Sequence, residues 1–304
     1  MPSAPRRPVV PDDLRPHPDH RQQAVASAAD PDLVEIGAQV GLRRYLAQLW
    51  EHREFALTVP LGQLQARNQD TMLGRAWYLL NPMLLIAIYY LIFQVILGIE
   101  GRRGVENFLP FLTVGVIVYG YTRSSVQSGA SSVVRSRRLV RSLFFPRTIL
   151  PLGVLIAQTT TYLYALGTML VLVLLMGEQP SWRWLLLPVA LAIQAVLNLG
   201  LALFAARFTF HFRDFSNLLP FVLRLGLYVS GVIIPINDQL VPQDPLRWLL
   251  QANPVYNVLE MNRQLVLGTS FEPRVWIVGT LWAAVLLVAG FVYFRRAEDR
   301  YSGV

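Results

Sequence analysis

Six apolar stretches, each long enough to cross a lipid bilayer, constrain the fold of this chain more than any other feature. A transmembrane helix needs about 20 predominantly apolar residues, because the hydrocarbon layer is about 30 Å thick. Six windows of the 304-residue sequence meet this requirement: 76–97, 108–127, 148–176, 184–206, 218–235 and 275–294. The third window is long enough to tilt or to project beyond the bilayer. We therefore expect an all-α membrane protein with six transmembrane helices.

The composition agrees with a bilayer as the solvent of this chain. Hydrophobic residues make up 54% of the sequence, charged residues only 15%, and the mean hydropathy is +0.41. A typical soluble domain carries about 25% charged residues. The absence of cysteine excludes disulfides and cysteine-ligated metals. The four histidines show no metal-ligand spacing, so we expect this chain itself to bind no metal and no cofactor.

All 27 basic residues are arginines, and their distribution predicts how the chain crosses the membrane. A net charge of +8 is also typical of nucleic-acid-binding proteins. Here the arginines flank the apolar windows, so the positive-inside rule explains them without a nucleic-acid partner. Nineteen lie on one predicted side, six on the other, and two inside the spans. The richer side should be cytoplasmic, with both termini there.

The segments outside the spans divide the rest of the chain. Residues 1–40, rich in Pro, Asp and Ala, predict a disordered cytoplasmic tail. Residues 41–75 predict an amphipathic interface helix followed by a short polar helix, residues 76–294 the six-helix domain, and residues 295–304 a cytoplasmic C-terminal tail.

The interface helix is predicted from apolar residues that recur at helical spacing opposite charged side chains. These residues are Leu42, Tyr45, Leu46, Leu49 and Trp50. Aromatic residues on the apolar face, flanked by arginines, are typical of a helix that lies in the membrane interface. A soluble helix packed on a partner is the alternative, and either structure would be a docking element.

The stretch between the last two spans predicts two short helices on the outer side. Its apolar pieces, 246–252 and 255–267, are too short to cross the bilayer and are separated by Asn253 and Pro254. Proline ends one helix and can start the next. Such a broken hydrophobic hairpin indicates re-entrant helices. A surface loop with two amphipathic helices is the alternative.

The chemistry missing from this chain excludes several function classes. No Asp or Glu falls inside any of the six windows, whereas proton-coupled transporters and intramembrane aspartyl proteases need buried carboxylates. The sequence contains no lysine, so it cannot form the P-loop that binds the phosphates of ATP. If this chain transports actively, the energy must come from a separate polypeptide. We expect it not to be an enzyme.

The predicted spans contain aromatic side chains, neutral polar side chains and two arginines that could contact a substrate. They suit sugar rings, which stack on aromatic faces and form hydrogen bonds at their edges. Packing between helices is the alternative for each tyrosine and glutamine, whereas a mid-span arginine costs about 2.5–3.5 kcal/mol on insertion scales. The candidate channel residues are Tyr89, Tyr90, Phe93, Tyr119, Arg123, Gln127, Gln158, Tyr162, Arg224 and Tyr228.

The densest basic patch outside the N-terminal tail lies at 131–147. Arg135, Arg138 and Arg141 share one helical stripe, and Leu139 and Phe144 belong to an apolar one. These features predict a short helix that docks on the missing energy-supplying subunit, with Phe144 and Phe145 as anchors. Positive-inside topology with lipid contact is the alternative.

Several motifs in this sequence together resemble one family. Residues 73–93 (LGRAWYLLNPMLLIAIYYLIF), 212–220 (FRDFSNLLP), 231–235 (GVIIP) and 253–268 (NPVYNVLEMNRQLVLG) resemble, in order, segments of ABC-2-type polysaccharide exporter permeases. The resemblance covers about 42–300 and is strongest to mycobacterial permeases for cell-wall galactan. One departure is Ser230-Gly231-Val232, where many members have Ser-Pro, which leaves the kink there open.

The resemblance implies a homodimer that pairs with two ATP-binding subunits, which hold the ATP and Mg²⁺, and exports a polyprenyl-pyrophosphate-linked polysaccharide. By analogy, 42–58 would be the interface helix, 61–72 a gate helix, and 131–147 the coupling helix. The implied substrate entrance comprises Arg67, Leu73, Gly74, Arg75 and Trp77. The implied coupling residues are Arg135, Arg138, Leu139, Arg141, Phe144, Phe145 and Trp50. The implied extracellular gate, within 246–268, contains Asn253, Pro254, Glu260 and Arg263.

Two other functions stay open at this point. An ABC-2 permease for a drug or a small lipid would also have an aromatic channel. A membrane-embedded glycosyltransferase would need catalytic carboxylates. The outer-loop candidates Glu100, Glu106, Glu260 and Glu272 show no pairing pattern.

Overall fold

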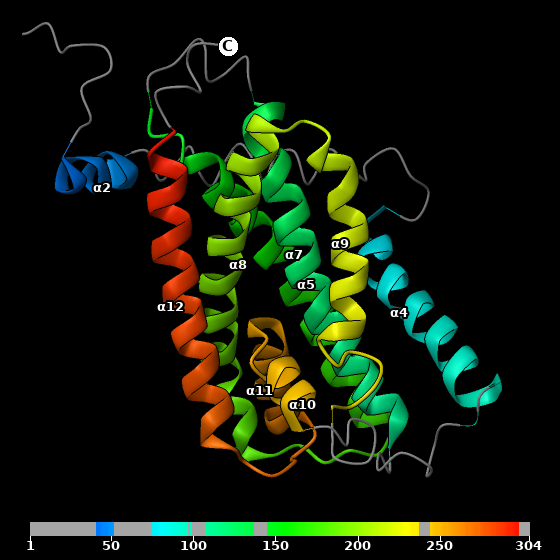
Figure 1. Ribbon diagram of the computed structural model, residues 1–304. Coiled ribbons are helices and arrows are strands. Elements are labelled where there is room, and N and C mark those ends of the chain that lie inside the picture. Colours follow the sequence, from blue (N-terminus) through cyan, green and yellow to red (C-terminus); the bar gives the residue numbers. More distant parts are fainter. Residues whose placement is uncertain are drawn as a thin grey trace, which may run out of the picture. The chain divides into compact units, whose positions relative to one another are not determined.

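The computed structural model describes residues 41–51, 74–96, 98, 107–136, 145–236 and 244–297. The chain divides into two units, Met1–Leu42 and Arg43–Val304. The description below concerns the second, because only the last two residues of the first are described. Every regular element within the described ranges is helical (Figure 1), in agreement with the predicted all-α class.

The helices occupy most of the described chain. Their bounds are α2 (Leu42–Glu51), α4 (Trp77–Tyr90), α5 (Phe108–Arg135), α7 (Ile149–Leu175), α8 (Leu187–His211), α9 (Phe215–Val229), α10 (Asp244–Gln251), α11 (Pro254–Val266) and α12 (Pro273–Arg295). A π-helical segment, Leu91–Ile96, continues α4, and a short 3-10 turn, Trp182–Leu186, leads into α8.

Three helices in the described part are long and apolar enough to cross a membrane: Ile149–Leu175, Trp182–His211 and Pro273–Arg295. Two shorter apolar helices, Leu79–Phe93 and Phe215–Val229, accompany them. A helix occupies each of the six predicted windows, but the count of six spans stays a prediction.

Helix α5 lies at the centre of the bundle, and α7, α8, α4, α9 and α11 all contact it. Its residues are buried on most sides, from Phe108 near one end to Val133 near the other. Figure 1 shows α5, α7, α8 and α12 running side by side, with α4 inclined away from them. Because most of α5 is surrounded by other helices, its buried polar side chains depend on partners inside the protein.

Small residues allow α8 and α12 to pack backbone against backbone. A Cβ atom added to Gly200 would lie 2.5 Å from the carbonyl carbon of Leu286, and one added to Gly290 would lie 2.5 Å from the carbonyl oxygen of Gly200. Glycine at helix contacts is how membrane helices approach closely, because lipid supplies no hydrophobic force between them. This seam fixes α12 against the bundle.

The structure differs from the predicted element bounds in two places. Helix α5 continues to Arg135, so the first residues of the predicted 131–147 loop extend the helix of the second span. This extension is stabilised by the Ser132 hydroxyl, which donates to the Gly129 carbonyl, and by the burial of Val133. Helix α9 ends at Val229, before the predicted limit of 235. Gly231 follows with φ of +68°, a conformation that glycine adopts without steric cost.

The N-terminal helix α2 lies beside the bundle, next to one end of α12 (Figure 1). The hydroxyl groups of Tyr45 and Thr148 are 2.7 Å apart, and the Tyr45 ring meets that of Phe291 edge to face. Helix α2 is described over Leu42–Glu51, and the rest of the predicted interface helix, to residue 58 or 59, lies outside the described residues. The predicted tail 1–40 and gate helix 61–72 lie outside the described residues.

Candidate functional site

The interior of the bundle contains a line of polar side chains that join α5 to α7 and α8. The Tyr121 and Thr159 hydroxyl oxygens are 2.6 Å apart, and the Tyr121 ring stacks on that of Tyr162 at 4.5 Å. Gln194 of α8 donates to the carbonyl of Val118 at 2.9 Å and to the Thr122 hydroxyl at 3.1 Å. These bonds satisfy polar groups that would be costly to leave unpaired inside apolar helices.

Two predicted channel tyrosines belong to this packed interior. Tyr119 and Tyr162 are each 3% exposed. The Tyr119 hydroxyl donates to the carbonyl of Leu223 on α9 and contacts Gly226 one turn further. Gln158 is half-buried and donates to the Ser128 hydroxyl at 3.2 Å. In this conformation Tyr119 and Tyr162 pack between helices, which was the alternative to a channel lining.

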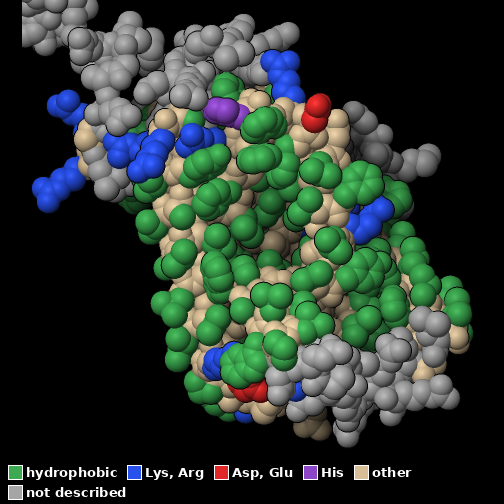
Figure 2. Space-filling model, in the orientation of Figure 1, with side chains coloured by type: hydrophobic (Ala, Val, Ile, Leu, Met, Phe, Trp, Pro, Cys, Tyr) green, Lys and Arg blue, Asp and Glu red, His purple; other side chains and the backbone are tan. Residues whose placement is uncertain are grey.

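The other predicted channel residues remain accessible on α4, α5 and α9. Arg224, Tyr228 and Gln127 are exposed, and the rest are half-buried: Tyr89, Tyr90, Phe93 and Arg123. The Tyr89 hydroxyl lies within electrostatic range of Arg123, Arg224 and Tyr228. The structure thus brings together polar groups from three helices that the sequence spreads over 140 residues. Figure 2 shows basic side chains among hydrophobic ones beside α9.

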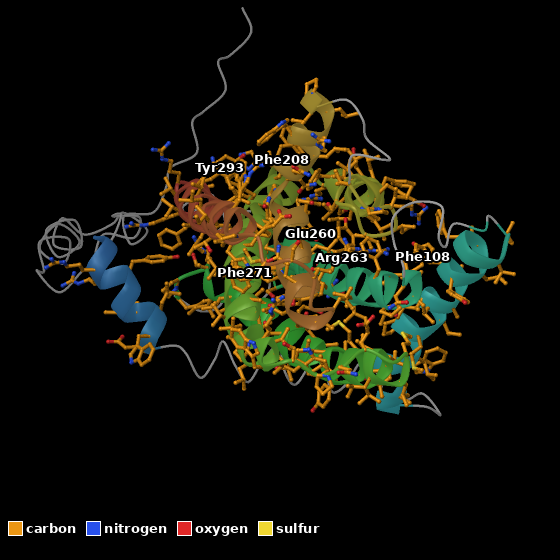
Figure 3. All side chains as sticks on the ribbon, turned by 90° about the horizontal axis from the view of Figure 1, so that it is seen from below. Phe108, Phe208, Glu260, Arg263, Phe271 and Tyr293 are labelled. Atoms are coloured by element: carbon orange, nitrogen blue, oxygen red, sulfur yellow. The ribbon has the colours of Figure 1, made fainter. Side chains whose placement is uncertain are left out.

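A buried arginine fastens the outer segment to the bundle. Arg263 of α11 is only 1% exposed. It donates to the Glu260 carboxylate at 2.8 Å and to the Val232 carbonyl at 3.0 Å, and its guanidinium lies 3.5 Å above the Phe111 ring. Figure 3 shows Glu260 and Arg263 side by side near the centre of the bundle. Burial lowers the pKa of Arg263, and the Glu260 carboxylate favours its charged form.

Glycine makes room for this contact. A Cβ atom at Gly115 of α5 would lie 2.6 Å from the Val232 carbonyl oxygen and 2.9 Å from a guanidinium nitrogen of Arg263. Only a residue without a side chain lets α11, α5 and the segment after α9 meet here. We call Arg263, Glu260, Phe111, Gly115 and Val232 the outer latch.

The break between α10 and α11 has the predicted form. Pro254 occupies the first turn of α11, and Asn253 caps the helix by accepting a hydrogen bond from the Val255 amide at 2.9 Å. The Asn253 amide also donates to the Ser230 hydroxyl at 3.0 Å. Both ends of the α11 segment are therefore tied to the residues that follow α9.

The predicted entrance and coupling residues fall only partly within the described chain. Gly74 opens a 3-10 turn with φ of +46°, Trp77 begins α4 half-buried, and the backbone of Arg75 lies between them. Arg135 is exposed at the end of α5, and Trp50 is 71% exposed. Phe145 is half-buried against Val133, Leu150 and Phe294. Arg67, Leu73, Arg138, Leu139, Arg141 and Phe144 lie outside the described residues.

Sequence reasoning did not single out Phe111, Gly115 and Val232 of the outer latch, or Tyr121, Thr159 and Gln194 of the interior line. The spacing of Glu260 and Arg263, three residues apart on a helix, could have indicated their ion pair. The other partners of Arg263 carry no sequence signal, because Phe111 lies 152 positions away in the sequence and Val232 lies 31 positions away.

Comparisons with known proteins agree on one family. Residues 60–267 match the family model described as "ABC-2 type transporter". The chain is similar to the "O-antigen export system permease protein RfbA" of Myxococcus xanthus, with 29% identity over 71% of this chain and 81% of that protein. It is also similar to a Klebsiella pneumoniae permease of the same name, with 21% identity over 79% of this chain and 91% of that protein.

Proposed function

Because this chain belongs to the ABC-2 type transporter family, we propose that it is the permease subunit of a polysaccharide exporter. As a member of this family it is a multi-pass membrane protein and a transport subunit, not an enzyme. The proposed cargo is a lipid-linked cell-wall polysaccharide, specifically a galactan, that moves from the cytoplasmic to the outer face of a bacterial cytoplasmic membrane.

The single observation that carries the proposal is the accessible face formed by α4, α5 and α9. Partly or fully exposed rings, hydroxyls and an amide come from Tyr89, Tyr90, Phe93, Gln127 and Tyr228, and Tyr89 interacts electrostatically with Tyr228 across the helices. Rings accept the C–H faces of sugars, and polar edges form hydrogen bonds with their hydroxyl groups. The similarity to two permeases named for O-antigen export supports a polysaccharide as the cargo.

The proposal includes an assembly. Two copies of this chain would enclose the path with their α4, α5 and α9 faces, and two separate ATP-binding subunits would supply the energy. The ATP-binding subunits would dock on the cytoplasmic side, at 131–147 and at α2, and both termini would lie there. The lysine-free sequence supports this division of labour, since the chain cannot form its own P-loop.

Depletion of this chain from its native cells tests the cargo. We expect a lipid-linked glycan to accumulate on the cytoplasmic side. Extraction and mass analysis would detect it, and a membrane-impermeant label for outer-face glycan would leave it unlabelled in intact cells. Re-expression of the wild-type chain is the control and should clear the accumulated material. A galactan would support the full proposal, and another glycan would refute only the galactan. Increased drug sensitivity without any accumulated glycan would refute polysaccharide export.

A further inference from the structure

Two arginines lie deep inside predicted spans on neighbouring helices. Arg123 is fifteen residues beyond the start of α5 and twelve before its end, so it lies about 22 Å and 18 Å from the two ends at 1.5 Å per residue. Arg224 lies nine residues beyond the start of α9, or about 14 Å along its axis. Arg123 is therefore well away from both ends of its helix, where a long side chain could readily reach water, whereas Arg224 lies five residues, or about 8 Å, before the end of α9 at Val229.

The packing of α9 on α5 places these arginines at a similar level. The Tyr119 hydroxyl donates to the carbonyl of Leu223, the residue just before Arg224. Arg123 follows Tyr119 by one helical turn on α5. The Tyr89 hydroxyl of α4 interacts electrostatically with both guanidinium groups and with the Tyr228 hydroxyl. Two positive charges and two hydroxyl donors therefore face a common region.

This region contains no carboxylate to neutralise the two charges. Helices α4, α5 and α9 carry no Asp or Glu, and neither does any of the six predicted spans. The Arg224 guanidinium lies 6.0 Å from the centre of the Phe221 ring and interacts electrostatically with the Tyr89 hydroxyl. A second copy of this chain would bring the same acid-free helices. Among the described residues these three helices therefore supply no counter-charge, which leaves the region suited to an anionic ligand.

The surroundings indicate what kind of molecule fits. Large apolar side chains lie exposed on the same elements, among them Ile88 on α4, Leu91 on the π-helical segment that continues it, and Phe221 and Leu225 on α9. A ligand here needs an apolar part as well as an anionic group. Guanidinium groups match the oxygens of a phosphate with two parallel hydrogen bonds each, and the tyrosine hydroxyls add two more donors.

We propose that Arg123 and Arg224, with the hydroxyls of Tyr89 and Tyr228, form a binding site for the phosphate group of an amphiphilic lipid at mid-depth in the membrane. The site would hold the charged end of a lipid during its passage between the leaflets. It is separate from the entrance implied at 73–77. The proposal rests on the proposed transport function, but its test measures binding and not export.

Binding to the full-length chain in phosphatidylcholine nanodiscs tests the site. Radiolabelled undecaprenyl pyrophosphate is the probe, and phosphatidylglycerol is the competitor. Arg123→Gln and Arg224→Gln should each weaken binding of the probe by roughly tenfold, and Arg123→Lys should retain most of it. Arg213→Gln, which removes an exposed arginine from the turn before α9, is the matched control and should bind like the wild type.

The outcomes separate the sources of the phosphate. Weak competition by phosphatidylglycerol would support a site for pyrophosphate-linked cargo, and equal competition a site for bilayer phospholipid. Unchanged binding in both Gln variants, or an equal loss in Arg213→Gln, would overturn the proposal. Thermal unfolding of each variant should match the wild type, which separates loss of the site from loss of the fold. Binding without glycan accumulation on depletion would refute the proposed cargo and leave this site standing.

Discussion

Replacing Arg263 with methionine should destabilise the protein more than any other single arginine substitution in the described chain. The side chain is 1% exposed and joins α11 to α5 and to the segment after α9. Methionine fills a similar volume with an apolar chain, so the substitution removes the charge and its donors and leaves little cavity. Glu260, at 22% exposure, would then carry an unpaired charge in a mostly buried place.

The magnitude follows from the contacts that are lost. The guanidinium has one charged partner at 2.8 Å, two carbonyl acceptors at 3.0 Å and 3.5 Å, and the Phe111 ring at 3.5 Å. Bonds to charged groups contribute about 1.5–3 kcal/mol each, and a desolvated cation–π contact about 2 kcal/mol. The cost of burying the charge offsets much of this sum. Breaking a buried ion pair by removing one partner costs about 3–5 kcal/mol.

Thermal unfolding in detergent at one fixed scan rate measures the effect, because membrane proteins often unfold irreversibly. A change of 1 kcal/mol shifts the Tm by about 2–4 °C for a chain of this size, so Arg263→Met should lower it by at least about 6 °C. Arg183→Met is the control, since Arg183 makes a single partly exposed bond to the Thr269 carbonyl. A Tm within about 2 °C of the wild type would refute the outer latch.

The paired variant Arg263→Met/Glu260→Leu separates pairing from packing. Replacing both members of a buried ion pair with apolar residues is often close to neutral. We therefore expect the double variant to unfold at a higher temperature than Arg263→Met alone. If the double variant were as unstable as the single one, the stability that Arg263 contributes would come from its bonds to the Val232 and Phe111 carbonyls. The ion pair with Glu260 would then contribute little.

Five further variants, at four positions, test the packing of the bundle, each by thermal unfolding. Tyr162→Phe should leave the Tm unchanged or raise it slightly, since the Tyr162 hydroxyl is buried without a partner among the described residues. Tyr121→Phe removes a hydrogen bond and should lower the free energy of unfolding by about 1 kcal/mol. Equal effects would refute the assigned bonding. Gly290→Leu should cost about 1–3 kcal/mol or more by forcing α12 from Gly200; a wild-type Tm would contradict the close seam. Asn253→Ala should cost about 1–2 kcal/mol through the lost cap, and Asn253→Ser should recover most of it.

The sequence predicted the fold well where hydrophobic length and proline determine it. Each predicted window contains a long helix, and the break at Asn253 and Pro254 separates α10 from α11. Bounds were less accurate where tertiary contacts decide them. Helix α5 runs past Gln127 because its last turns pack against α8, where Gly129 meets Ala202, and no local signal in the sequence reveals that contact.

The candidate site was harder to predict, because helical spacing shows which residues share a face but not what the face meets. Tyr119, Arg123 and Gln127 share one stripe of α5, yet they pass from buried to half-buried to exposed along it. Tyr119 is covered by α9, to which its hydroxyl donates at the Leu223 carbonyl, and helical spacing on α5 does not reveal that contact. Arg263, which was predicted to lie on the outer side, is buried among three segments, and only the folded chain defines these contacts.

Arg263 and Arg123 differ in whether a carboxylate lies one helical turn away, and a substitution can remove that difference. Arg263 has Glu260 three residues before it and is held in place, whereas Arg123 has the neutral Gln127 four residues after it. Gln127→Glu would give Arg123 a partner on the same exposed strip of α5. This variant should lower the affinity for undecaprenyl pyrophosphate several-fold although both arginines remain, while the neutral Gln127→Asn should not. Unchanged binding in Gln127→Glu would show that Arg123 was never an open cation, and the mid-depth phosphate site would fall with it.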